Sequence, residues 1–262
     1  MMIQMIVSLL TMILAGTSVP VKSQDSSPLP AHAHNDYYHD QPLIDALDYR
    51  FRSVEADIYT RGDSLYIAHD RKEITPGRTL RALYLDPLEH LTRFNGGSIY
   101  HDDTPFILLV DIKDRGLNTY LLLHEILIKY EHMLASYAHG NVNQGGIMVI
   151  ISGNRPVQFM KTQEQRYAFV DGRLPDLERN YPPDLMPLIS DNWRRNFNWN
   201  GEGAIPESER EKLRQLVKKA HENGQMVRFW ATPDQPGEGR VAVWKELRRA
   251  GVDLINTDDL EG

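Results

Sequence analysis

Short apolar runs alternate with amphipathic runs along most of this chain, and this alternation restricts its fold more than any other feature. Strands are expected at residues 29–34, 53–58, 106–112, 146–152, 167–170, 186–190, 226–230 and 253–256, with an extra hairpin strand at 65–68. Helices are expected between them at 43–50, 79–94, 117–136, 207–223 and 241–250. Eight strands that alternate with helices in roughly 230 residues predict an α/β fold, a (β/α)8 TIM barrel.

An open doubly wound sheet is the alternative arrangement of the same elements. That fold places a glycine-rich turn after its first strand. Here the first strand is followed by Asn35-Asp36-Tyr37, which contains no glycine. The closed barrel is therefore the preferred fold.

Composition narrows the class of protein. The chain has 262 residues, 41% of them hydrophobic, and a formal net charge of -7. That length and core content suit one large domain, and no basic block is dense enough to follow a nucleic-acid backbone. There is no cysteine, which excludes disulfides, thiolate zinc sites and cysteine nucleophiles. We expect no nucleic-acid partner, and the oligomeric state stays open.

The first residues read as a targeting segment. Residues 2–14 are mostly apolar but too short to span a bilayer, and small residues follow them, as in a secretory signal peptide. No cation precedes Lys22, which departs from that pattern, so the true start could lie upstream. We expect a signal peptide at 1–23, a linker at 24–30 and a single domain at 31–262. We therefore expect an exported protein without a stable membrane anchor, located in a bacterial periplasm or outside the cell.

Two strands carry carboxylates at positions that should share one face. Glu55 and Asp57 are two residues apart in the second strand, and Asp111 and Lys113 repeat the spacing at the third. Alternate residues of a strand share a face, and inward residues at the carboxyl ends of barrel strands line the active site. Converging carboxylates need a neutraliser, and oxygen ligands favour Mg²⁺ or Ca²⁺. An ion-pair network with Lys113 or Arg228 is the structural alternative.

Two histidines border this carboxylate-lined mouth. His34 closes the first strand, and His69 ends the extra hairpin. A pair of histidines at one rim is suited to acid and base catalysis near neutral pH. Asp70, which follows His69, is expected to orient or cap instead of reacting.

The order of these residues resembles a known superfamily. His34, Glu55-x-Asp57 and His69-Asp70 look like the glycerophosphodiester phosphodiesterase and phosphatidylinositol-phospholipase-C-like barrels. Within it, the chain is similar to the altered inheritance of mitochondria protein 6 family and its bacterial relatives, through His32-Ala-His34-Asn35-Asp36-Tyr37, Ser53-Val-Glu55-Ala-Asp57 and Thr79-Leu-Arg81-Ala-Leu-Tyr84-Leu-Asp86-Pro87-Leu88. The match is strong over residues 31–87. It is looser through Asp111-Ile-Lys113, Ser152-Gly-Asn154-Arg155-Pro156 and Asn256-Thr257-Asp258.

The resemblance implies a role for each residue. His34 and His69 would be the catalytic pair of a metal-dependent phosphoric diester hydrolase, and Lys113 would contact the phosphate. The substrate would be a small-molecule or lipid phosphodiester. One divalent cation would be held by Glu55, Asp57 and Asp111.

The chain also departs from the resemblance. Glycerophosphodiesterases carry Arg-Gly after the first histidine, where this chain has Asn35-Asp36. Arg155 is a candidate replacement for the missing phosphate-binding arginine, and Asn35, His32 and Trp230 are further substrate-binding candidates. The spacing from His34 to Glu55 is closer to that of the sphingomyelinase-D-like toxins of the same superfamily, which form cyclic phosphates. Hydrolysis and cyclisation therefore both stay open.

Two other functions fit parts of the pattern. His32-x-His34 also begins amidohydrolase-type enzymes, in which both histidines bind zinc, but those enzymes need further histidines after middle strands. Of the ten histidines here, none follows the fourth, fifth or sixth strand except His221, inside an expected helix. The second alternative is a secreted barrel that binds a ligand without turning it over.

Overall fold

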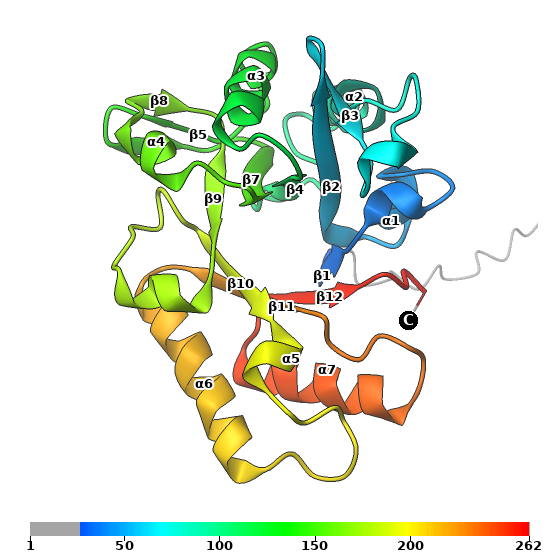
Figure 1. Ribbon diagram of the computed structural model, residues 1–262, viewed down its shortest axis with the longest axis vertical. Helices are drawn as coiled ribbons and strands as arrows, with labels where there is room; N and C mark the ends of the chain where they lie inside the picture. The colour runs from blue at the N-terminus through cyan, green and yellow to red at the C-terminus, as the bar shows by residue number, and fades with distance from the viewer. Residues whose placement is uncertain (1–26, 262) are drawn as a thin grey trace, which may run out of the picture.

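Residues 27–261 are described by the computed structural model, and their centre is a closed barrel of parallel strands (Figure 1). The strands pair in chain order, and β1 closes the barrel by pairing with both β2 and β12. The predicted (β/α)8 barrel is therefore confirmed. Its eight strands are β1 (Leu29–Ala33), β2 (Phe51–Arg61), β4 (Phe106–Ile112), β7 (Ile147–Gly153), β9 (Phe169–Gly172), β10 (Leu188–Asn192), β11 (Met226–Trp230) and β12 (Leu254–Thr257).

Two apolar layers lie on opposite faces of the strands. Val54, Ala56 and Ile58 of β2 belong to the large outer cluster between strands and helices. A smaller cluster fills the barrel interior and comprises Ile107, Leu109, Ala135, Ile150, Phe169, Leu188 and Leu254. Because side chains alternate along a strand, the polar residues of β2 face the interior, above this small core.

The helices cover the outside of the barrel and join its strands (Figure 1). They are α1 (Ile44–Asp48), α2 (Asp86–Phe94), α3 (Leu117–Ile128), α4 (Val157–Thr162), α5 (Trp193–Asn196), α6 (Glu207–Glu222) and α7 (Glu238–Ala250). Short turns of helix add η1 (Asp36–Tyr38), η2 (Arg71–Glu73), the π-helical η3 (Arg81–Leu85) and η4 (Leu174–Glu178). Within the described range, no helix combines the length and apolar character needed to cross a bilayer.

Two additions decorate the barrel. The expected hairpin strand is β3 (Ser64–Ile67), which pairs antiparallel with β2. A small second sheet was not expected, and it consists of β5 (Ser136–Ala138), β6 (Asn141–Asn143) and β8 (Gln165–Arg166). These residues alternate too briefly to be separated from loop by pattern alone.

Several expected boundaries were wrong. The helix expected at 117–136 ends at Ile128, although Met133 and Leu134 are buried and continue its apolar pattern. Apolar residues can be buried in turns as well as in helices, so the apolar periodicity predicted a helix that was too long. The expected strands at 167–170 and 186–190 each begin two residues later, as β9 and β10. The predicted signal peptide lies outside the described residues, and β1 begins at Leu29, inside the expected linker.

Candidate active site

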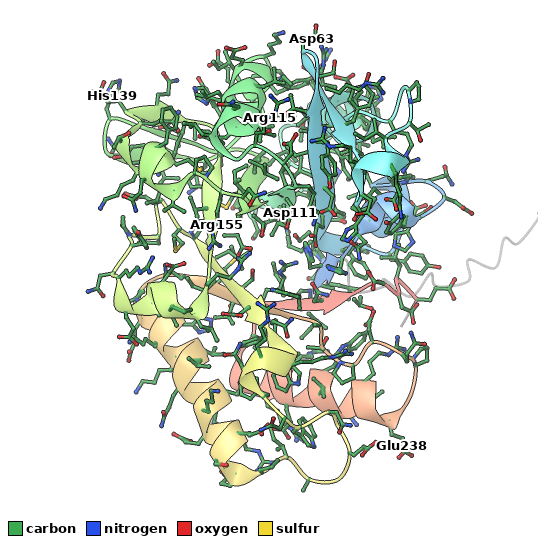
Figure 2. All side chains as sticks on the ribbon, in the orientation of Figure 1. Asp63, Asp111, Arg115, His139, Arg155 and Glu238 are labelled. Carbon is green, nitrogen blue, oxygen red and sulfur yellow. The ribbon has the colours of Figure 1, made fainter. Side chains whose placement is uncertain are left out.

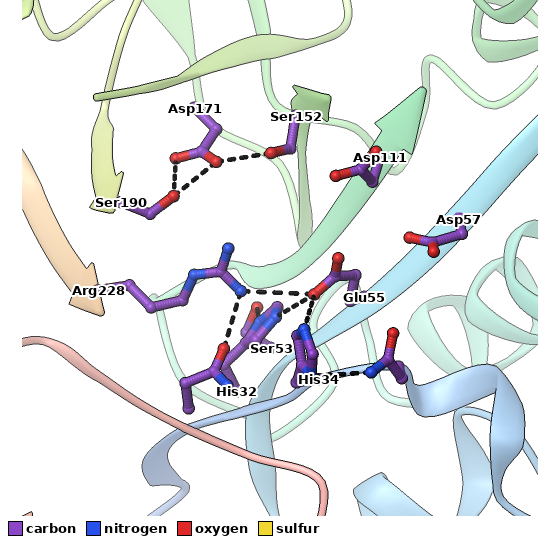
Figure 3. Close-up of polar contacts among 12 residues, drawn as sticks. His32, His34, Ser53, Glu55, Asp57, Asp111, Ser152, Asp171, Ser190 and Arg228 are labelled. Atoms are coloured by element: carbon purple, nitrogen blue, oxygen red, sulfur yellow. Dashed lines mark hydrogen bonds and ion pairs between the residues drawn. The ribbon is translucent and has the colours of Figure 1, made fainter. Parts of the chain in front are cut away.

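Each of the eight barrel strands contributes a polar side chain to a ring near the mouth. The ring consists of His32, Glu55, Asp111, Ser152, Asp171, Ser190, Arg228 and Asn256. All of these except Asp111 are buried. Figure 3 shows two separate hydrogen-bond networks, one around Asp171 and one around Glu55, with Asp111 and Asp57 to the right of both.

Three carboxylates of this region converge as predicted. Glu55, Asp57 and Asp111, here called the acidic triad, each place one oxygen within 4.8 Å of the others. Strand register explains this, because Asp57 of β2 lies directly beside Asp111 of β4. Gly153 lies beside Asp111, and a Cβ atom there would come within 2.2 Å of Asp111 Oδ1. The glycine thus leaves room for the carboxylate.

The two oxygens of Asp57 differ in their surroundings. Oδ2 accepts from the Tyr37 hydroxyl at 2.6 Å and lies 2.9 Å from both His69 Nδ1 and Lys113 Nζ. Oδ1 is buried and has no hydrogen-bond partner among residues 27–261. An unpartnered buried carboxylate oxygen is unfavourable. A divalent cation between the triad oxygens would satisfy it, so the donor set fits Mg²⁺ or Ca²⁺.

Protein cations also touch the triad. Lys113 Nζ lies 2.9 Å from Asp57 Oδ2 and 3.3 Å from Asp111 Oδ1, and Arg228 Nη1 lies 3.5 Å from Glu55 Oε2. The ion-pair network considered from the sequence is therefore present. It leaves Asp57 Oδ1 unsatisfied, so ion pairing alone does not complete the site.

The carboxylates of the triad differ in their affinity for protons. Burial and repulsion from Glu55 raise the pKa of Asp57 to about 6, against the opposing effect of Lys113. Burial likewise raises the pKa of Asp111. Burial also acts to raise the pKa of Glu55, but the hydrogen bond from His32 and the nearby cations lower it overall. Asp57 and Asp111 therefore hold a proton more tightly than Glu55 does, and a bound divalent cation would offset the cost of keeping these two carboxylates ionised.

His34 is held on one side of the mouth. Its Nδ1 lies 2.8 Å from Asp258 Oδ1, while its Nε2 faces inward, 3.8 Å from Glu55 Oε2. Burial acts to lower the pKa of His34, but the hydrogen bond to Asp258 and the charge of Glu55 outweigh it and raise that pKa. The side-chain amide of Asn35, the residue after His34, also donates a hydrogen bond to Asp258 Oδ1 at 3.2 Å. Asp258 was not singled out from the sequence, although it lies in the Asn256-Thr257-Asp258 segment.

His69 is held in the same way, by a different carboxylate. Its Nδ1 lies 2.9 Å from Asp57 Oδ2, and its side chain is half exposed. Tyr37 connects the surroundings of the two histidines, because its hydroxyl contacts Asn35 Oδ1 at 2.8 Å as well as Asp57. Asp70 and Glu73 form a capping box at η2, which agrees with the capping role expected for Asp70.

His32 lies beneath the mouth. It is fully buried, with Nδ1 2.7 Å from Ser53 Oγ and Nε2 3.3 Å from Glu55 Oε2. Burial and the nearby Arg228 lower its pKa to about 3, so it is neutral. The structure places neither His32 nor His34 in a group of three potential metal ligands within the described chain. The observed contacts of His32 are those of a support for Glu55.

The opposite wall of the mouth carries two arginines. Arg155 donates to the backbone carbonyl of Asp171, and its Nη2 lies 3.9 Å from Asp176 Oδ2. Arg173, which sequence reasoning missed, donates to Asp171 Oδ2 at 2.7 Å and to Ser152 Oγ at 3.1 Å. Arg155 is seen near Asp111 in Figure 2, and Arg173 contacts Ser152, which lies beside Asp111 in the neighbouring strand. Trp230 ends β11 and is partly exposed.

The closed parallel barrel and the family matches together place the chain in the phospholipase-C-like phosphodiesterase superfamily. Within that class, residues 21–171 match the AIM6-like phosphodiesterase domain, and residues 226–261 match the glycerophosphoryl diester phosphodiesterase family. The first match covers more than half of the chain. The chain belongs to the AIM6-like phosphodiesterase domain family.

Curated relatives and solved structures agree with this family. The chain is 28% identical to the altered inheritance of mitochondria protein 6 homolog of Arthroderma benhamiae, over 89% of this chain and 82% of that protein. It is 27% identical to altered inheritance of mitochondria protein 6 of Eremothecium gossypii, over 88% of this chain and 67% of that protein. A calcium-dependent phosphoinositol-specific phospholipase C from Pseudomonas shares the fold, with a TM-score of 0.55 and 9% identity over 88% of this chain and 90% of that chain.

The expected location was wrong. The matching curated relatives are fungal proteins named for altered inheritance of mitochondria, not bacterial periplasmic or extracellular proteins. The expectation depended on the apolar run at 2–14. Apolar length and small residues are shared by several kinds of targeting segment, so the run could not specify a bacterial export route.

Proposed function

We propose that this protein is a metal-dependent phosphoric diester hydrolase in which His34 and His69 are the acid/base pair. One observation carries the proposal. Each histidine is paired with a carboxylate through Nδ1, His34 with Asp258 and His69 with Asp57. Pairing at Nδ1 fixes the ring and leaves Nε2 for proton transfer. Two such histidines beside one acidic triad are suited to an acid and a base that act on opposite sides of one phosphorus.

Other side chains of the site would bind the phosphate and the cation. Lys113 would contact a phosphoryl oxygen, and Glu55, Asp57 and Asp111 would hold one Mg²⁺ or Ca²⁺. The bound cation would supply charge stabilisation for the phosphoryl oxygens. One histidine would take a proton from the attacking oxygen as the new P–O bond forms. The other would give a proton to the leaving alcohol oxygen as its bond to phosphorus breaks.

The substrate would be a small-molecule or lipid phosphodiester, as the family name and the calcium-dependent phospholipase neighbour suggest. The attacking oxygen distinguishes two outcomes. Attack by water gives a phosphomonoester, and attack by a neighbouring hydroxyl of the substrate gives a cyclic phosphate. Both use the same histidine pair.

The test is phosphorus NMR of the purified protein with a panel of glycerophosphodiesters and lysophospholipids. We expect a product from at least one diester, loss of that product with EDTA, and recovery with added Mg²⁺ or Ca²⁺. Monoester and cyclic phosphate signals separate hydrolysis from cyclisation. His34→Ala and His69→Ala should each abolish turnover, whereas Glu238→Ala should not, because Glu238 is exposed and distant from the mouth in Figure 2. A panel without any chelator-sensitive product would overturn the proposal.

A further inference from the structure

Asp258, the carboxylate that pairs with His34, lies outside the barrel strands at an exposed position. Asp258 comes directly after β12, and its side chain is 59% exposed. An exposed ion pair contributes little unless its geometry is fixed from elsewhere. The 2.8 Å contact between Asp258 Oδ1 and His34 Nδ1 therefore depends on what holds the backbone around Asp258.

A second carboxylate holds that backbone. The N–H of Asp258 donates to Asp234 Oδ2 at 2.7 Å. Asp234 lies in the loop between β11 and α7, where Ala231 adopts a positive φ of 58°. A non-glycine residue in this region is strained, so the path of the loop is maintained by its surroundings. The loop carries Asp234 across to the end of the neighbouring strand.

Arg240 connects the same two segments. It is buried at the start of α7 and donates from Nη1 to Asp259 Oδ2 at 2.6 Å and to the Asp234 carbonyl at 3.3 Å. The backbone of His34 completes the arrangement, because its N–H donates to the Thr257 carbonyl at 2.9 Å. Residues 257–259 are thus fixed from the β11–α7 loop, from α7 and from β1.

We propose that Asp234 is a positioning residue, which acts by accepting the Asp258 N–H and so keeping the Asp258 carboxylate on His34 Nδ1. This inference rests on the proposed function, since it assigns a purpose to the His34 orientation. Asp234 itself has no described contact with the acidic triad, His69 or Lys113. Its effect reaches the reaction only through Asp258.

The kinetic test compares Asp234→Ala with Asp234→Asn in the full chain. The substrate is the glycerophosphodiester turned over fastest in the panel above. Alanine removes the acceptor, and kcat should fall by about 10-fold to 100-fold while KM changes little, as expected for a misoriented acid or base. Asparagine keeps a carbonyl oxygen that can accept the same N–H, and it should restore most of the rate. Asp234→Ser, which is too short to reach, should behave like alanine and serves if the alanine variant folds poorly.

A second readout separates this inference from the proposed function. Side-chain NMR of ¹⁵N-labelled protein, with the His34 ring assigned by comparison with His34→Gln, reports the Nδ1 hydrogen bond without any substrate. Asp234→Ala should shift the His34 ring signals and leave those of His221 unchanged, and Asp234→Asn should restore them. Unshifted His34 signals in the alanine variant would overturn the inference, whether or not the protein turns over a diester. An equal loss of kcat in the matched control Glu238→Ala would also overturn it.

Discussion

Nδ1 of His69 lies 2.9 Å from Oδ2 of Asp57, so one carboxylate of the acidic triad also orients a histidine. The same Oδ2 accepts from Tyr37, while Oδ1 has no partner in the described part of the chain. Asp57 therefore has one oxygen committed to the protein and one available for a cation. This division couples cation binding to the orientation of His69.

Asp57→Asn tests that coupling. We expect the affinity for Mg²⁺ or Ca²⁺ to fall by about 100-fold or more, since a charged ligand is lost and even its supporting partners are worth 10-fold to 100-fold. Turnover should be lost even at saturating cation, because the amide is a weaker acceptor for His69. Isothermal titration calorimetry and the phosphorus NMR assay measure the two effects. Tight cation binding that survives the substitution would place the cation elsewhere.

Gly153→Ala tests the position of Asp111. The added Cβ would lie 2.2 Å from Asp111 Oδ1, and the φ of Gly153 is +65°. Gly203→Ala is a matched control, because its φ is +63° and nothing lies within 4 Å of the added atom. Both variants should lose about 1 kcal/mol of stability from backbone strain, and Gly153→Ala should lose more, because its Cβ would also lie 2.6 Å from the Ile112 carbonyl oxygen. Only Gly153→Ala should also lose cation affinity, as measured by calorimetry, and equal affinities in the two variants would contradict the expectation.

The sequence was sufficient to identify which residues form the acidic triad, but it did not reveal which side chains the two histidines contact. Glu55, Asp57 and Asp111 were predicted to converge because strand periodicity and chain order suffice once a parallel barrel is assumed. The pairing of His34 with Asp258 spans 224 residues, and no local pattern encodes which loop reaches a given rim.

Local sequence patterns also failed to reveal that Arg173 lies with Arg155 at the mouth. Arg173 follows β9, a strand expected two residues too early, so its position at the mouth was not recognised. The polar ring was likewise hidden, because Ser152 and Ser190 are single hydroxyl residues at the ends of apolar runs. Such residues acquire meaning only when Asp171 is seen to accept hydrogen bonds from both.

Asp36 should make stability depend on pH. Burial raises its pKa to about 6 in the folded protein, against the hydrogen bonds from Leu43 N–H and Tyr84 OH. The folded state therefore holds the Asp36 proton more tightly than the unfolded state does, and this contribution is lost as the pH rises from about 4 to about 6. Asp36→Asn removes the titration. Relative to the variant, wild type should lose about 2 kcal/mol of unfolding free energy between pH 4 and pH 7. Urea denaturation at pH 4 and pH 7 measures this change, and a constant difference between the two proteins would refute it.

Lys113→Met separates ion pairing from cation binding at the triad. Lys113 contacts both Asp57 and Asp111, so its removal leaves the buried Asp57 and the partly exposed Asp111 without this protein cation. Without added cation, the melting temperature of the variant should fall below that of wild type, because an unpaired buried charge is costly.

Added Mg²⁺ or Ca²⁺ should then raise the melting temperature of the variant more than that of wild type. Binding contributes about 2.7 kcal/mol at 100 times the dissociation constant, so at one shared cation concentration a larger rise in the variant reports tighter binding once the competing ammonium is gone. Turnover should stay low even with the cation bound, because the contact from Lys113 to the phosphate is missing. If neither protein is stabilised by either cation, the triad is a purely ionic network with Lys113.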